Sequence, residues 1–205
     1  MTKKIILTIL ITLLPLILIT ASVDSIIFNK KAYLRYKSEV NNQEEKIINL
    51  LDYFKNNKKL MNQKGFTQEE RLHFLDVKNI IITIKSILLL SLMLTSMLLI
   101  NLFTKTKKKE LKKLLSDYLI NGSLITLTIV LMAFLLALNF NNSFNLFHSL
   151  LFKAGTWTFP ATSLSIRLFP IELFQGFAKN ILTRITFVSL ILLSIGIVYK
   201  KLFSH

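Results

Sequence analysis

The sequence predicts an all-α membrane protein with four transmembrane helices and two outer-face segments that contain amphipathic or interfacial helices. Hydrophobic residues make up 52% of the 205 residues, and the mean hydropathy is +0.53. Four apolar segments, 5–23, 80–103, 118–140 and 181–199, approach or reach the ~20 residues that a membrane-spanning helix needs. A soluble helical core is the alternative, but the run at 80–103 is too long and too uniformly apolar for one face of a globular helix.

The first apolar segment has two interpretations. Its basic start, its apolar stretch and the small residues of "ITASVDS" also suit a cleaved signal peptide. The apolar run is longer than the usual core of such a peptide, and its removal would leave three helices. We therefore expect segment 5–23 to be the first transmembrane helix of one membrane domain that spans residues 1–205.

The basic residues near the helix ends predict the orientation of the chain. Lys3 and Lys4 precede the first helix, "TKTKKKELKK" at 104–113 lies between the second and the third, and Lys200 and Lys201 follow the fourth. Short basic flanks stay in the cytoplasm. We therefore expect both termini and the loop 104–117 to be cytoplasmic, and segments 24–79 and 141–180 to lie outside.

The distribution of charge excludes several classes of function. The net charge is +15, but ten basic residues lie in the three cytoplasmic flanks, where anionic membrane lipid attracts them. Nine of the eleven acidic residues lie in the two outer segments. We therefore expect no nucleic-acid partner. The chain has no cysteine, which excludes disulfides, thiolate metal sites and a cysteine nucleophile.

The first outer segment predicts two helices with a break between them. Apolar residues recur at helical spacing over 47–54, which indicates an amphipathic helix at the membrane surface or packed on a neighbour. The stretch "NNKKLMNQKG" then interrupts it. Thr67 followed by Glu70 matches a capping box, so a new helix should start at about Gln68 and continue into the second transmembrane helix.

A histidine lies near the start of that second helix. Glu69 and Glu70 precede His73 by four and three residues, and Asp76 follows it by three. Residues three and four apart share a helix face, so an acidic side chain can reach the imidazole and orient it.

The second outer segment is poor in polar residues, yet Pro160 and Pro170 break it too often for a membrane span. His148 lies there on an apolar helical stripe with Phe144, Phe147, Leu151 and Phe152. Trp157 is expected at the level of the lipid headgroups. A second short amphipathic piece should start near Pro170, with Leu173, Phe174 and Phe177 on one side and Glu172 and Gln175 away from it.

A histidine on an apolar face is usually structural, but His73 and His148 lie in different outer segments at the same membrane surface. They form a candidate acid–base pair, whereas His205 ends the chain on the cytoplasmic side. The HExxH spacing of zinc enzymes and the GxSxG turn of serine hydrolases are both absent, so we expect no metal and no other cofactor. Ser149 points to another helix face than its neighbour His148.

Two stretches of the outer segments resemble a known family. "FTQEERLHFLDVKN" and "FHSLLFKAGTWTFPATSLSIRLFPIELF" are similar to the signature regions of the lipoprotein intramolecular transacylases (Lit), small four-helix membrane proteins of low-GC Gram-positive bacteria. The topology agrees over almost the whole chain. The family commonly has an aspartate a few residues after the tryptophan, where this chain has Thr162 and Ser163.

The resemblance implies an enzyme of the bacterial cytoplasmic membrane with its active site on the outer face. It would move the sn-2 acyl chain of a diacylglyceryl-modified lipoprotein to the α-amino group of that lipoprotein's amino-terminal cysteine, in contact with membrane lipid. His73 and His148 would be catalytic, with Asp76 and Glu69 as supporting residues. The expected substrate contacts are Phe147, Trp157, Phe159 and Arg71.

Two other functions fit the sequence less well. A non-catalytic protein that binds lipid or lipoprotein would present the same apolar outer groove without moving an acyl chain. A transporter or sensor is disfavoured because the four apolar segments contain no paired internal charges.

Overall fold

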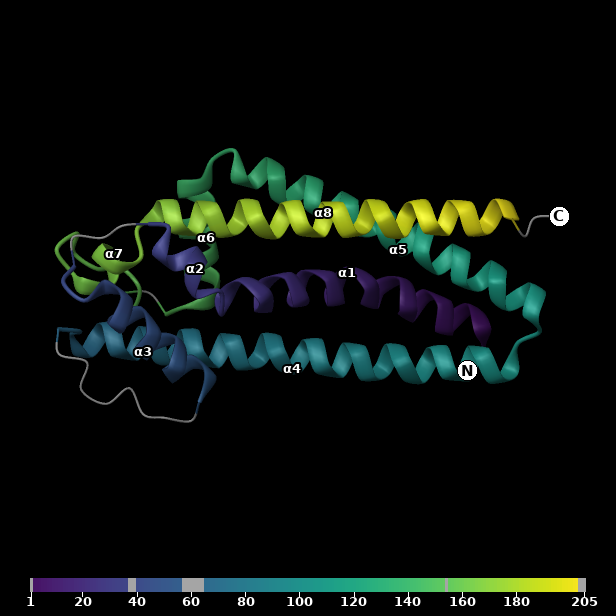
Figure 1. Ribbon diagram of the computed structural model, residues 1–205, viewed down its shortest axis with the longest axis horizontal. Helices are drawn as coiled ribbons and strands as arrows, with labels where there is room; N and C mark the ends of the chain where they lie inside the picture. Colours follow the sequence, from purple (N-terminus) through teal and green to yellow (C-terminus); the bar gives the residue numbers. More distant parts are fainter. Residues whose placement is uncertain (1, 37–39, 57–64, 154, 203–205) are drawn as a thin grey trace. The chain divides into compact units, whose positions relative to one another are not determined.

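The computed structural model describes residues 2–36, 40–56, 65–153 and 155–202. Within these residues every regular element is an α-helix (Figure 1). The helices are α1 (Lys3–Ile27), α2 (Lys30–Leu34), α3 (Gln43–Lys55), α4 (Gln68–Lys105), α5 (Lys108–Ala137), α6 (Phe140–Leu151), α7 (Leu164–Leu168) and α8 (Ile171–Leu202).

Four of the described helices, α1, α4, α5 and α8, are long and apolar enough to cross a membrane. Three of the predicted apolar segments lie wholly inside them. The predicted segment 118–140 extends past the end of α5 at Ala137, because a new helix starts there. Asn139 caps that helix, α6, and its side-chain oxygen accepts a hydrogen bond from the backbone N–H of Asn142 at 3.4 Å.

The chain forms two compact units. Unit 1 consists of Met1–Val23, Lys85–Leu135 and Ile181–His205, and unit 2 of Asp24–Ile84 and Leu136–Asn180. The predicted outer segments lie in unit 2, together with both histidines of the candidate pair.

Unit 1 packs its helices through small residues. Ser116 in α5 donates a hydrogen bond from its hydroxyl to the backbone carbonyl of Gly196 in α8 at 2.9 Å. A Cβ at Gly196 would lie 3.0 Å from the Cβ of Leu119, so only glycine permits this approach of the two helices. Small residues at such contacts are typical of helices that pack inside a bilayer.

Large apolar side chains cover the outside of unit 1. Met97 is 68% exposed and Leu90 63% exposed, and many neighbours on α4, α5 and α8 resemble them. A surface of this kind is unfavourable in water and suits the hydrocarbon of a membrane.

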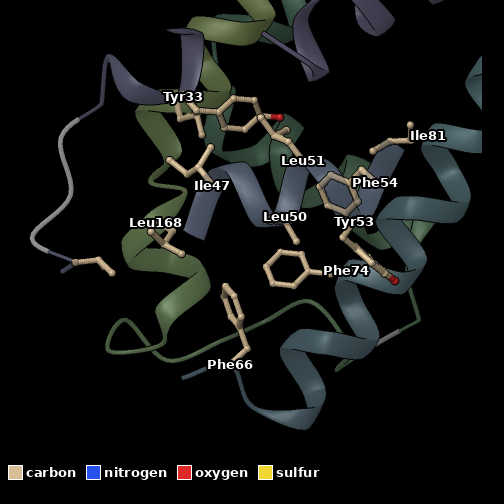
Figure 2. Close-up of a cluster of buried hydrophobic side chains, with 12 residues drawn as sticks. Tyr33, Ile47, Leu50, Leu51, Tyr53, Phe54, Phe66, Phe74, Ile81 and Leu168 are labelled. Atoms are coloured by element: carbon tan, nitrogen blue, oxygen red, sulfur yellow. The ribbon is translucent and has the colours of Figure 1, made fainter. Parts of the chain in front are cut away.

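Unit 2 has its own hydrophobic core, which contains the apolar face of α3 (Figure 2). Ile47, Leu50, Leu51 and Phe54 are buried there, which confirms the amphipathic helix predicted over 47–54. Figure 2 shows Phe66 and Phe74 turned toward each other below Leu50, and their ring centroids are 5.0 Å apart.

The predicted capping box is confirmed at the start of α4. The backbone N–H of Glu70 donates to the hydroxyl of Thr67 at 3.2 Å, and the backbone N–H of Thr67 donates to the Glu70 carboxylate at 2.7 Å. α4 begins at Gln68 as predicted. Most of the predicted break before it, residues 57–64, lies outside the described residues.

The amphipathic piece predicted near Pro170 is not a separate helix. It forms the first turns of α8, which continues without interruption to Leu202. The predicted sides are confirmed, because Leu173 is fully buried while Glu172 and Gln175 are exposed.

Candidate active site

The structure brings His73 of α4 and His148 of α6 together in unit 2. Their ring centroids lie 6.2 Å apart, and the two ring planes are inclined by only 23°. His148 is 9% exposed, and His73 is half-buried. His73 and His148 are 75 positions apart in the sequence and were predicted to form a pair. The structure places them in one site.

Aromatic rings enclose the two imidazoles. Phe152, the residue that caps the C-terminus of α6, lies 4.6 Å from His73 and 5.3 Å from His148 between ring centroids. Phe159 packs edge-on against His73 at 5.6 Å, and Trp157 packs on His148 at 5.1 Å. The loop between α6 and α7 thus covers both histidines with one aromatic side chain each.

A backbone hydrogen bond determines which nitrogen of His148 carries the proton. Nδ1 of His148 lies 2.8 Å from the carbonyl oxygen of Phe144, one turn earlier in α6. A carbonyl oxygen can only accept, so Nδ1 must be the donor. In the neutral ring Nε2 is then unprotonated, and its lone pair is available to take a proton.

Burial favours this neutral form of His148. Desolvation lowers the pKa of His148 below its ordinary value of 6.5, and the hydrogen bond to Phe144 opposes that shift because the charged ring donates more strongly. Since burial is the larger effect, the ring remains neutral at pH 7 and can act as a base.

His73 has a different environment. Its Nδ1 is buried, and the described residues supply no hydrogen-bond partner for it. An unsatisfied buried polar atom costs about 1–3 kcal/mol, so such atoms are uncommon in folded proteins. A polar group of a bound substrate would remove this cost.

The acidic residues predicted to orient His73 do not do so through a hydrogen bond. Asp76 acts on the imidazole through its charge, but among the described residues no hydrogen bond joins it to the ring. Glu69 is exposed at the first turn of α4. Their supporting roles remain predictions.

Glu70 has a role that the sequence did not predict beyond the capping box. Its side chain is 1% exposed. One carboxylate oxygen accepts hydrogen bonds from the backbone N–H and the hydroxyl of Ser165, at 2.8 and 2.6 Å, and the other oxygen accepts from Thr67. Glu70 therefore joins the start of α4 to the start of α7.

The predicted substrate contacts are divided between the aromatic cluster and the surface. Phe147 is 53% exposed, yet its ring centroid is 5.4 Å from that of His148. Arg71 is exposed on α4. Ser163, at the position where the family commonly has an acid nearby, caps α7 by accepting from the backbone N–H of Ile166. A serine serves this capping role without a carboxylate.

A cleft of about 780 Å³ with a mixed polar and apolar wall adjoins the histidine site. Phe159, which packs on His73, also forms part of its wall. The other lining groups come from α3, from the start of α4, from the loop after α6 and from α7, and they include Lys46, Thr67, Thr158 and Arg167.

A sequence model of one family, described as lipoprotein intramolecular transacylase Lit, matches residues 5–174. The chain belongs to this family. It is accordingly a membrane-bound acyltransferase. A search of curated proteins gave no significant match.

Solved structures of the membrane integral lipoprotein intramolecular transacylase Lit from Bacillus cereus have the same fold. One is 23% identical, covers 97% of this chain and 96% of that chain, and has a TM-score of 0.83. Another is a variant of that protein with one histidine replaced by alanine. It is 22% identical, with coverage of 97% and 94% and a TM-score of 0.77.

Sequence reasoning missed three features of this Lit site. Phe152 was placed on the apolar stripe, but its contact with both histidines depends on the tertiary fold. The bond from Glu70 to Ser165 spans 95 positions, and no local pattern signals it. The short helix α7 was also missed, although Ser163 before an apolar stretch is a helix-start signal.

Proposed function

We propose that the protein transfers the sn-2 acyl chain of a diacylglyceryl-modified lipoprotein to the α-amino group of the same lipoprotein's amino-terminal cysteine. The α-ammonium loses a proton and attacks the ester carbonyl, so a C–N bond forms and the ester C–O bond breaks. The glycerol oxygen takes a proton to become a hydroxyl, and the amide nitrogen keeps one hydrogen. One proton is released overall.

The observation that carries this proposal is the pair of near-parallel imidazoles within an aromatic enclosure, in a chain of the Lit family. Amine and ester belong to one substrate molecule, so no acyl-enzyme is needed and the absence of cysteine is no obstacle. The protein has to position the substrate and move protons.

The two histidines divide the proton transfers in this proposal. His148 is the base for the α-ammonium, because its Nδ1 is held by Phe144 and its Nε2 remains free to accept. His73 stabilises the developing oxyanion or protonates the departing glycerol oxygen, and the buried Nδ1 of His73 then gains a partner. Burial and the neighbouring His148 lower the pKa of His73 to about 4, and the charge of Asp76 only partly opposes this shift, so the ring is neutral at pH 7.

Positioning should contribute more than either histidine. Holding amine and ester in reactive contact contributes up to roughly 7–11 kcal/mol, whereas a general base contributes about 10²–10⁴ in rate. The aromatic side chains Trp157, Phe147 and Phe159 are suited to seat the acyl chains that hold the ester in place.

The test is acyl transfer on a reporter diacylated lipoprotein by purified variants, followed by fragmentation mass spectrometry. The total mass of the substrate stays constant while one acyl chain moves to nitrogen. His148→Ala and His73→Ala should each lower the rate by about 10²–10⁴. The double variant should be only slightly slower than the slower of the two single variants, because the effects of two residues that act in one step do not add.

Ser149→Ala is the matched control, since Ser149 adjoins His148 but its hydroxyl donates to the carbonyl of Leu146 at 2.8 Å. Its rate should be unchanged. Near-normal N-acylation by folded variants of both histidines would contradict the mechanism. A lipoprotein that binds the unsubstituted protein without any movement of acyl chains would favour a non-catalytic binding function instead.

The proposed setting is the bacterial cytoplasmic membrane, with both termini in the cytoplasm and the histidine site on the outer face. Two ion pairs within unit 1 support the prediction that the basic flanks lie on the same side of the membrane. Lys3 at the start of α1 pairs with Glu110 at the start of α5 at 2.6 Å, and Lys200 near the end of α8 lies 3.8 Å from Asp117.

A further inference from the structure

The mixed wall of this cleft differs in chemistry from the aromatic enclosure that it adjoins. Thr67, Thr158 and Thr162 line it together with the cations Lys46 and Arg167 and the carboxylates Glu69 and Glu70, beside apolar side chains such as Val40, Pro160 and Leu164. The hydroxyl, ammonium, guanidinium and carboxylate groups can pair with both the carbonyl and the N–H groups of a peptide backbone, and the apolar part of the wall can contact peptide side chains. The volume of about 780 Å³ lies within the range of ~300–1,000 Å³ that is usual for sites that enclose a ligand.

The position of the cleft limits what can occupy it. Phe159 lines the cleft and also packs on His73, so a molecule bound in the cleft lies beside a molecule bound at the histidines. The proposed substrate branches at its amino-terminal cysteine into apolar acyl chains and a polypeptide. The aromatic enclosure suits the first branch, and the cleft, whose wall combines charged, hydroxyl and apolar groups, suits the second.

We infer that this cleft binds the stretch of polypeptide that directly follows the modified cysteine of the substrate. This inference rests on the proposed function and assigns a separate subsite to it. About four extended residues span roughly 13 Å, so the first few residues of the substrate are the ones that enter. Lys46 and Arg167 donate to peptide carbonyls there, which holds the α-amine near the histidines.

Two bulky substitutions test the subsite. Thr162 is exposed and lines the cleft, whereas its neighbour Ala161 is equally exposed and does not line it. Thr162→Trp fills the cleft, and Ala161→Trp is the matched control. Each variant is assayed in detergent with two synthetic substrates, a diacylglyceryl cysteine amide without a peptide and the same molecule followed by four residues.

The unsubstituted protein should have a KM for the peptide-bearing substrate that is lower by roughly tenfold than its KM for the amide, since the added contacts improve binding. Thr162→Trp should remove this difference by raising the KM for the peptide-bearing substrate to that for the amide. Ala161→Trp should preserve the difference.

Three outcomes would overturn the inference. Equal KM values for both substrates in the unsubstituted protein would show that the peptide makes no contact. An equal loss on both substrates in Thr162→Trp would assign the cleft to the glyceryl lipid or to folding. A loss of the difference in Ala161→Trp would show that it does not depend on the cleft. If the unsubstituted protein transferred no acyl chain in either substrate, the proposed function itself would fail.

Discussion

His148 is subject to two opposing influences on its pKa. Burial among Phe144, Phe152 and Trp157 disfavours the charged ring, and the hydrogen bond to the Phe144 carbonyl favours it. Because burial dominates, the pKa lies below 6.5 and the neutral base persists as the pH falls through 6.5. The acid limb of the reaction rate should therefore lie below pH 6.5.

Phe152→Ser tests this cause of the shift. Replacing an 8% exposed ring 5.3 Å from His148 with a small polar side chain admits water and reduces desolvation. The pKa of His148 should rise toward its ordinary value, so the acid limb of kcat should move to higher pH whatever happens to the maximal rate. The measurement is the pH dependence of single-turnover acyl transfer in both proteins. An acid limb at the same pH in both proteins would show that His148 is not the base.

At the scale of helices, the bond from Glu70 to Ser165 connects two elements that carry the site. Glu70 lies one turn before His73 on α4, and Ser165 follows the loop that carries Trp157 and Phe159. The carboxylate accepts three hydrogen bonds, one from Thr67 and two from Ser165. These bonds fix the orientation of Ser165 relative to the start of α4 as well as its distance. Glu70 therefore holds the residues that directly follow this loop against the start of α4.

Glu70→Gln should destabilise the fold, because the amide of glutamine places a donor against one of the donors of Ser165 or Thr67. We expect a cost of about 1–3 kcal/mol, seen as a lower Tm in detergent. Glu69→Gln makes the same change at an exposed neighbour and should leave Tm unchanged. Equal Tm values for the two variants would refute this role of Glu70.

The same region shows which parts of the structure the sequence can predict. The capping box of Thr67 and Glu70 and the buried face of α3 are local patterns, and both are confirmed. The Glu70 carboxylate also has a second, distant set of donors, and a capping box does not reveal them. The continuity of α8 from Ile171 into the predicted fourth transmembrane segment was missed, because the polarity of the sequence changes at about residue 180 while the helix continues.

At the scale of the whole chain, the basic flanks are the basis for the predicted orientation. The ion pairs of Lys3 with Glu110 and of Lys200 with Asp117 bring the first flank and the end of α8 to the start of α5 within unit 1. Loops rich in Lys resist translocation, so this end should stay in the cytoplasm. The natural chain contains no cysteine, so single introduced cysteines report without background.

A membrane-impermeant maleimide should label Asn56→Cys in intact cells, because Asn56 is exposed at the end of α3 in a predicted outer segment. Lys108→Cys, at the exposed start of α5, should react only after the membrane is permeabilised. Labelling of both sites after permeabilisation controls for their accessibility in the folded protein. The opposite pattern in intact cells would reverse the orientation and place both histidines in the cytoplasm, where a lipoprotein modified on the outer face could not reach them.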